Sequence, residues 1–216
     1  FFTIFCILIV INGFNFIDGM NTLLIGYCLI VSFSLYYLNL NDIEVSKIIN
    51  LYNLIHVLMV LFILNFFNKL YLGDGGSYFL GLLFALYLIN TYQINNNISP
   101  YFIVCLLWYP AFENLFSILR KKKLSKSPLQ PDTNHLHQII FLYLKKKFNI
   151  ESVYLNTITG LIINFYNFIS IAIATHFYSH TKIQILIILF NISIYIFFYK
   201  KLLNKKNLKY FNPHKK

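Results

Sequence analysis

The apolar residues of this chain come in long continuous blocks that are separated by short polar segments. A block of about 20 apolar residues has the length that a helix needs to cross a bilayer. The blocks are continuous rather than alternating, so they favour helices over the strands of a membrane barrel. We therefore predict an all-α, polytopic transmembrane helical bundle with about seven spans, at 1–11, 22–40, 48–68, 78–91, 99–119, 152–174 and 183–200.

The composition supports a membrane protein. Of the 216 residues, 58% are apolar and only 12% are charged, which is about half the charged fraction of a soluble domain. Seven spans and short connections leave little soluble mass, so we expect a single integral-membrane domain over 1–216. Cys6, Cys28 and Cys105 lie in apolar segments without metal-ligand spacing, and we expect them to be small buried hydrophobic residues.

The basic residues predict the orientation in the membrane. If the spans alternate, sixteen of the eighteen Lys and Arg residues fall on one side. The positive-inside rule makes that side cytoplasmic. We expect 120–151 to be a cytoplasmic loop and 201–216 a basic cytoplasmic tail, with their bases at an anionic membrane surface. Segments 12–21 and 69–77 then face the cytoplasm as well.

Segment 12–21 carries polar residues at a helical spacing. Asn12, Asn15, Asp18 and Asn21 recur every third residue, so on a helix they share one face. Gly19 could end or kink that helix. A helix cap in an Asn-rich chain is the alternative interpretation.

Segment 71–77, Tyr71-Leu72-Gly73-Asp74-Gly75-Gly76-Ser77, combines an acid with glycines between two spans. A carboxylate at a membrane edge is costly to desolvate unless a cation uses it. Glycines let backbone N–H groups approach a phosphate closely. The segment predicts a metal-bridged phosphate site, and a plain tight turn is the alternative. Tyr71 could stack on a base or anchor the chain at the interface.

His135 and His137 form a third polar cluster. Two residues apart, they point the same way in an extended segment but diverge by about 200° on a helix. Imidazoles can donate to phosphate oxygens or transfer protons. We do not expect structural zinc, because no third and fourth ligands are near. A polar loop with two incidental histidines is the alternative.

Glu113 is the only acid within the span 99–119. Arg120 lies two turns further along the same helix face. The sequence leaves two interpretations open: Glu113 pairs with Arg120, or it faces the site.

Together these clusters resemble glycosyltransferase family 4, the polyprenyl-phosphate N-acetylhexosamine-1-phosphate transferases of bacterial envelope synthesis. The match looks closer to the branch that uses simple UDP-N-acetylhexosamines than to the muramoyl-pentapeptide branch. The motifs that carry the resemblance follow the family order along the chain: Asn12-x-x-Asn15-x-x-Asp18-Gly19, Gly73-Asp74-Gly75-Gly76-Ser77, Pro110-x-x-Glu113 and Pro131-Asp132-x-x-His135-Leu136-His137.

The resemblance implies a reaction and a set of roles. An oxygen of undecaprenyl phosphate attacks the β-phosphorus of a UDP-N-acetylhexosamine, and UMP leaves. The cofactor is Mg²⁺, with Mn²⁺ as the alternative ion, at the cytoplasmic face of the bacterial inner membrane. The implied catalytic residues are Asp18, Asp74, His135 and His137, with both aspartates as metal ligands. The implied nucleotide- or phosphate-binding residues are Asn15, Asn21, Tyr71, Gly73 and Ser77, and the supporting residues are Asn12, Glu113 and Asp132.

The sequence departs from the family pattern at three positions. Asn21 stands where a second acid is usual, Gln138 where a further histidine is common, and Thr133 where an arginine often follows the aspartate. The early Asp-Asp cluster of the family would precede Phe1. We therefore expect an N-terminally truncated chain that is inactive alone.

The sequence leaves two other functions open. A decayed, non-catalytic homologue is one, because of Asn21 and Gln138. A transporter is the other, although the span interiors are nearly free of charge and no repeat is visible. We expect no nucleic-acid partner, and a homo-oligomer is left open.

Overall fold

The computed structural model describes residues 1–123 and 134–210, with side chains as far as residue 204. All regular structure within these ranges is helical, which confirms the predicted all-α fold. The helices of the described part are α1 (Phe2–Ile17), α2 (Leu23–Leu40), α3 (Leu51–Phe66), α4 (Gly73–Gln93), α5 (Pro100–Leu106), α6 (Trp108–Lys123), α7 (Leu136–Lys147), α8 (Ser152–His176) and α9 (Thr181–Tyr210).

Capping residues fix where two of the helices begin. The side chain of Asn50 accepts the N–H of Asn53 at 3.2 Å at the start of α3. Ser99 accepts the N–H of Tyr101 at 3.3 Å at the start of α5, with Pro100 in the first turn. Asn and Ser oxygens satisfy N–H groups that lack an intrahelical partner, and proline suits the first helical position.

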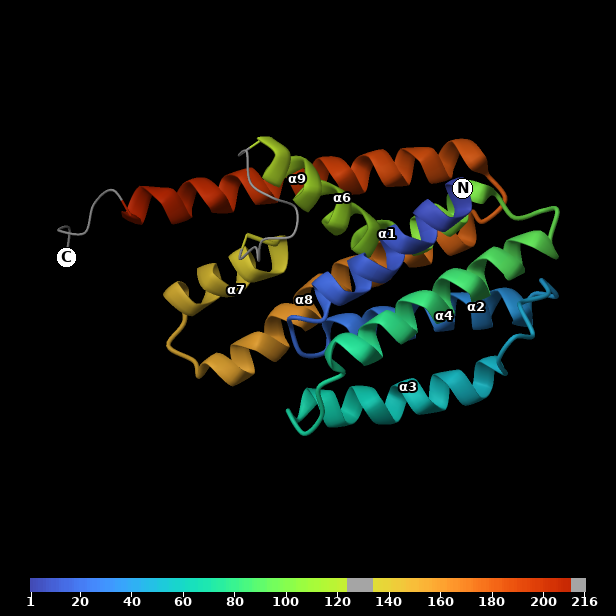
Figure 1. Ribbon diagram of the computed structural model, residues 1–216, viewed down its shortest axis with the longest axis horizontal. Coiled ribbons are helices and arrows are strands. Elements are labelled where there is room, and N and C mark those ends of the chain that lie inside the picture. Colours follow the sequence, from blue (N-terminus) through green and yellow to red (C-terminus); the bar gives the residue numbers. More distant parts are fainter. Residues whose placement is uncertain (124–133, 211–216) are drawn as a thin grey trace.

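The long helices lie side by side along the long dimension of the molecule (Figure 1). Helix α1 packs against α4 and α6, α2 packs against α3 and α8, and α7 packs against α8 and α9. Figure 1 places the connections after α1 and α3 at the same end as α7, and the connections after α2, α4 and α8 at the other. We call the first end, formed by residues 18–22, 67–72 and 134–151, the polar end.

The expectation of about seven spans is an overstatement. Three described helices are long and apolar enough to cross a membrane: Leu23–Leu40, Ser152–His176 and Thr181–Asn204. The bent pair α5 and α6 makes a fourth if it counts as one span. Helix α3 has 16 residues, so it rises about 24 Å, less than the roughly 30 Å hydrocarbon core. Helix α4 has the length, but polar and glycine residues at its ends lower its hydropathy.

The predicted span 99–119 is broken, with a bend of 76° between α5 and α6. The cause is Pro110 in the first turn of α6, because proline has no N–H to donate to the carbonyl four residues earlier. That carbonyl belongs to Leu106, and it accepts instead the hydroxyl of Tyr27 at 2.9 Å. A side chain of α2 therefore satisfies the backbone group that the break leaves open.

Two other expectations about segments change. Residues 73–77 form the first turns of α4 and not a separate turn. The expected loop 120–151 contains a helix, α7, and part of it, including Asp132, lies outside the described residues. The cysteines are free; Cys28 and Cys105 are buried as predicted, and Cys6 is half-buried.

Hydrogen bonds between buried side chains join neighbouring spans. The hydroxyl groups of Ser34 on α2 and Thr175 on α8 lie 2.6 Å apart. Asn191 on α9 donates to the hydroxyl of Ser170 on α8 at 2.7 Å. Such bonds contribute about 0.6 kcal/mol each in membrane proteins, so they select the packing of the spans more than they stabilise it.

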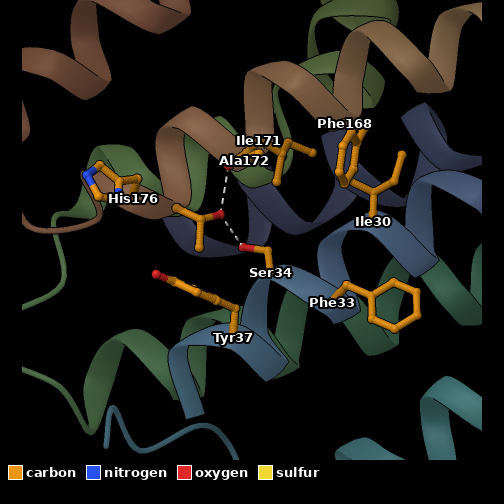
Figure 2. A pocket seen from close by; sticks show the side chains of 9 residues that line it. Ile30, Phe33, Ser34, Tyr37, Phe168, Ile171, Ala172 and His176 are labelled. Atoms are coloured by element: carbon orange, nitrogen blue, oxygen red, sulfur yellow. Dashed lines mark hydrogen bonds between the residues drawn. The ribbon is translucent and has the colours of Figure 1, made fainter. Parts of the chain in front are cut away.

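The Ser34–Thr175 pair lines a cavity of about 300 Å³ between α2 and α8, together with Phe33, Tyr37 and Phe168 (Figure 2). Tyr37 lies near the C-terminal end of α2. The N-terminal end of α2 follows the polar segment 18–22, so this cavity lies away from the polar end.

Candidate active site

The last turn of α1 and the first turns of α4 meet through Asn15. The side-chain amide of Asn15 donates to Asp74 Oδ1 at 2.8 Å and to the Ser77 hydroxyl at 3.2 Å. The hydroxyl of Ser77 donates in turn to the backbone carbonyl of Asp74 at 3.1 Å. These contacts bring together three of the residues that the sequence nominates, from segments about 60 positions apart.

The start of α4 is open to a ligand. Asp74 is exposed, and no side chain caps the N-terminus of the helix. Methyl groups at Gly73 or Gly75 would meet nothing within 4 Å. The N–H groups of a first helical turn attract anions, and the helix dipole adds to the attraction. This end of α4 can therefore receive phosphate oxygens, with the Asp74 carboxylate beside them.

Asp18 ends α1 and is half-buried. Burial, and to a smaller extent the negative charge of Asp74, raise the pKa of its carboxyl to about 7, and the backbone N–H of Gly73 opposes the shift. Two carboxylates that share a site disfavour each other's ionised form. A cation between them would relieve this repulsion.

The histidine pair lies at the N-terminus of α7, against the end of α1. His135 precedes the helix with an extended backbone, and His137 is in its first turn. Their rings stack at a centroid distance of 5.5 Å and an angle of 10°. The ring of Phe16 lies 5.0 Å from that of His135, and a methyl group at Gly19 would lie 3.5 Å from His137 Nε2. The mixed extended and helical backbone lets both rings point the same way.

His137 is fully buried, and both of its ring nitrogens lack a hydrogen-bond partner among the described residues. Burial lowers the pKa of its imidazole to about 4; the Glu113 charge opposes this shift and His135 adds to it. His137 is therefore neutral at physiological pH, with one donor and one acceptor nitrogen. A buried polar group without a partner costs free energy, and a ligand oxygen here would remove that cost.

The structure decides between the two interpretations of Glu113. Its Oε1 lies 2.9 Å from His135 Nδ1 and accepts the Leu136 N–H at 3.1 Å. Its Oε2 accepts the hydroxyl of Tyr195 on α9 at 2.7 Å. Glu113 thus holds His135 and the start of α7 in place through these hydrogen bonds. Nothing in the sequence marked Tyr195, which sits in a continuous apolar run.

Gln138 has a structural role that accounts for one departure from the family pattern. Its side-chain oxygen accepts the N–H of His135 at 3.4 Å. The bond satisfies a backbone donor at the start of α7, as the third residue of a helix often does. Gln138 therefore helps to hold the backbone of the histidine pair.

Asn21 belongs to a network that holds the segment 18–22. Its side-chain amide donates to Asn68 Oδ1, and its backbone N–H donates to Asn156 Oδ1 at 2.9 Å. A methyl group at Gly160 of α8 would lie 2.2 Å from the carbonyl oxygen of Asn21, so only glycine allows this approach. These hydrogen bonds connect Asn21 to α8 and to the α3–α4 connection, and not to Asp18 or Asp74.

The remaining nominated residues lie at the margin of the site. Asn12 is exposed and donates to the backbone carbonyl of Leu8 at 2.8 Å. Tyr71 is 70% exposed next to the start of α4, a position that fits either role considered for it. Asp132 lies outside the described residues.

The carboxylates fit a Mg²⁺ ion in part. No group of three or more His, Cys, Asp or Glu side chains within the described ranges could hold a metal ion. Mg²⁺ commonly takes only one or two carboxylates and completes its six oxygen ligands with water and substrate phosphates. Asp18 and Asp74 could supply these two carboxylates.

The fold and the site define a helical membrane protein with paired carboxylates, an open helix start and a histidine pair at one end. Comparison with known proteins confirms the resemblance to glycosyltransferase family 4: the family model, described as glycosyl transferase family 4, matches residues 1–92. This stretch contains Asp18 and Asp74 but not the histidines.

Curated proteins give a second, independent comparison. The chain is 27% identical over 146 residues to the undecaprenyl-phosphate alpha-N-acetylglucosaminyl 1-phosphate transferase of Escherichia coli strain K12. The aligned region covers 65% of this chain and 40% of that protein. It is 28% identical over 149 residues to the decaprenyl-phosphate N-acetylglucosaminephosphotransferase of Mycolicibacterium smegmatis. This aligned region covers 59% of this chain and 37% of that protein. The chain thus spans about two fifths of the length of these relatives. No solved structure matches it.

Proposed function

We propose that this chain forms part of the active site of a membrane transferase. The enzyme moves a sugar 1-phosphate from a UDP-N-acetylhexosamine to undecaprenyl or a related polyprenyl phosphate, and it starts a lipid-linked glycan of the bacterial envelope. The names of the similar proteins support the acceptor and the transferred group. The UDP carrier follows from the family resemblance.

One observation carries the proposal: the end of α1 contacts every other polar segment. Asn15 binds Asp74, Phe16 lies against His135, and Gly19 lies against His137. Asp18, between them, interacts with both Gly73 and Asp74. A bare helix cap or an incidental polar loop gives no reason for these segments to converge.

The proposed reaction needs charge compensation and alignment more than acid–base chemistry. A phosphate oxygen of the acceptor forms a bond to the β-phosphorus of the donor. The bond from that phosphorus to the oxygen bridging the two phosphates breaks, and UMP leaves with the electron pair. No proton has to move, and catalysis of such transfers comes mainly from positioning and electrostatics.

The residues of the site have matching roles in this scheme. The N–H groups of the first turn of α4 bind phosphate oxygens, and neutral His137 donates a hydrogen bond to another. Asn15 fixes the orientation of the Asp74 carboxylate. Asp18 and Asp74 would hold Mg²⁺ or Mn²⁺, which when bound offsets the negative charge of two substrates that otherwise repel each other.

Basic residues favour the same end for anionic substrates. Lys145, Lys146 and Lys147 are exposed in the last turn of α7, the helix whose first turn carries the histidine pair. Each lysine near an anionic leaflet contributes about 1 kcal/mol to membrane attraction. We place this end at the cytoplasmic face of the bacterial inner membrane, where the bases also raise the local concentration of UDP-sugar.

The replacement Asp74→Asn in the intact protein tests the proposal. Removing the charge should lower transfer of labelled N-acetylhexosamine phosphate to undecaprenyl phosphate by about 100-fold or more, which is typical for loss of one key electrostatic contact. Membrane insertion should be unchanged. The matched control is Asp42→Asn, an exposed position with positive φ that asparagine tolerates.

Transfer at the wild-type rate by Asp74→Asn would contradict the assigned role. An intact wild-type protein without transfer from any UDP-N-acetylhexosamine, in membranes that contain it in folded form, would support a non-catalytic homologue instead.

A further inference from the structure

Tyr195 of α9 is the one described side chain outside the sequence motifs whose hydroxyl reaches the carboxylate behind the histidine pair. It is 1% exposed, and it donates to Glu113 Oε2 at 2.7 Å. Neither the family motifs nor the matched residues 1–92 include it. Its position therefore calls for a physical explanation of its own.

The Glu113 carboxylate divides its two oxygens between two parts of the molecule. Oε2 receives the α9 hydroxyl, whereas Oε1 receives the Leu136 N–H and contacts His135 Nδ1. A carboxylate only accepts, so Nδ1 of His135 carries the proton and Nε2 is the nitrogen left for a ligand. The Tyr195 bond thus fixes the rotation of the group that sets the tautomer and orientation of His135.

Packing fixes the direction of the Tyr195 hydroxyl. The tyrosine ring lies 4.9 Å from Phe112 and 5.3 Å from Phe116 in edge contacts, and it stacks on Tyr199 at 6.2 Å. A buried carboxylate needs all of its donors, because each lost partner leaves charge desolvated and unpaired. Loss of the hydroxyl would let Glu113 turn toward other donors and away from His135.

We propose that Tyr195 is a positioning residue for the transfer reaction: through Glu113, it holds His135 and the first turn of α7 in the orientation that receives the substrate. The inference rests on the proposed function and extends it to a helix that carries none of the family motifs. Tyr195 does not touch substrate; it acts only through Glu113.

The test compares Tyr195→Phe with Tyr166→Phe in the intact protein. Phenylalanine keeps the ring packing and removes only the hydroxyl. Tyr166 is the matched control, because its hydroxyl donates to Asn191 Oδ1 at 2.5 Å and also joins α9 to the bundle, without touching Glu113. We expect Tyr195→Phe to lower kcat about tenfold, consistent with a hydrogen bond to a charged group, with KM for both substrates within about twofold. Tyr166→Phe should keep the wild-type kcat.

A second background separates positioning from a general loss of structure. In His135→Asn, the replacement Tyr195→Phe should cause no further loss of kcat, because its effect passes through His135. Independent, multiplicative losses in the double variant would overturn the proposal, as would equal kcat values for Tyr195→Phe and Tyr166→Phe.

Hydrogen exchange supplies a readout that does not need activity. The amides of residues 136–139 should exchange about tenfold faster in Tyr195→Phe than in the wild type. In Tyr166→Phe they should exchange at the wild-type rate. If the wild-type protein transfers no sugar phosphate, the proposed function fails while this measurement still decides the Tyr195–Glu113–His135 connection. Equal exchange in both variants would refute it.

Discussion

Asp18 and Asp74 are the same residue type in different surroundings, and this gives them different chemistry. Asp74 is exposed at a helix start, whereas half-buried Asp18 has its pKa raised to about 7 by burial and by the neighbouring charge. The Asp18 carboxyl therefore holds its proton more readily than an ordinary aspartate does. A divalent ion bound by the carboxylates of both Asp18 and Asp74 would compete with the proton on Asp18.

His137 makes the stability of the protein depend on pH. Its folded pKa is about 4, below the ordinary 6.5, because burial disfavours the charged ring. Between these values the unfolded chain binds a proton that the folded chain does not, so the free energy of unfolding falls as pH falls from about 6.5 to 4. The full contribution is about 3 kcal/mol.

The replacement His137→Leu should remove this contribution. From pH 7 to pH 5 the Tm of the detergent-solubilised variant should fall less than that of the wild type. His180→Leu, at an exposed position in the α8–α9 connection, is the control for loss of a surface histidine. Parallel curves for His137→Leu and the wild type would show that His137 titrates normally in the folded protein.

At the residue scale, the sequence could nominate the site residues but not the residues that hold them in place. The spacing of Asn15 and Asp18, with the Gly73–Asp74 pair, was enough to predict one shared face. Asn21 has the same spacing, yet its backbone N–H donates to Asn156 of α8. Helix α1 ends before Asn21, so the shared helix face does not extend to it. Glu113 had two open roles, since the choice depended on Tyr195, more than 80 residues away and in an apolar run.

The N-terminus of α4 shows how an element can be misjudged from composition. The glycines of segment 73–77 suggested a turn, but only Gly73 has a positive φ, of 64°; the others are helical. Gly73 reverses the chain after the α3–α4 connection, and the helix starts at once. Glycine is therefore required at one position, and at Gly75 it keeps the surface of the first turn bare.

The pair Gly73→Ala and Gly75→Ala tests this distinction. A methyl group meets nothing within 4 Å at either position, so steric clash is absent from both. Alanine at 73 must adopt a left-handed backbone, which costs about 1 kcal/mol, and its Tm should fall. Alanine at 75 is a better helix former than glycine, so its Tm should equal or exceed that of the wild type. Equal Tm values for the two variants would contradict a special role for Gly73.

Most elements were predictable because apolar runs in this chain coincide with helices. Each predicted span overlaps an observed helix, and the boundaries agree best for α2. The break at Leu107 was not predicted, because a proline in the middle of an apolar run, such as Pro110, permits either a kink or a new helix. The hydroxyl of Tyr27 favours the break, and that contact is long-range. Helix α7 was missed, since its apolar stretch, residues 139–144, is too short for a span and lies between the histidine cluster and three lysines.

At the scale of the whole molecule, the site and most of the described bases lie at the same end. The connections at 18–22 and 67–72 and helix α7 share the polar end, as Figure 1 shows. The opposite end carries Lys47, which pairs with Glu44 at 2.7 Å, and Lys182. A cytoplasmic polar end would put the carboxylates where a water-soluble sugar nucleotide is available and where the lipid phosphate lies at the same depth. The arrangement of the helices is compatible with that orientation, but the orientation itself comes from the positive-inside rule.

Reporter fusions test the orientation directly. A phosphatase that is active only outside the cytoplasm should be active when fused after Asn96, in the connection between α4 and α5, and silent when fused after Lys147, at the end of α7. A reporter that works only in the cytoplasm should give the opposite pattern at the same two positions. The two sites lie at opposite ends of the bundle, so they cannot report the same side if the helices cross the membrane. Phosphatase activity after Lys147, together with no activity after Asn96, would show that the bundle has the opposite orientation in the membrane. It would place Asp18 and Asp74 on the side where sugar nucleotides are not supplied, and the transferase proposal would then fail with the orientation.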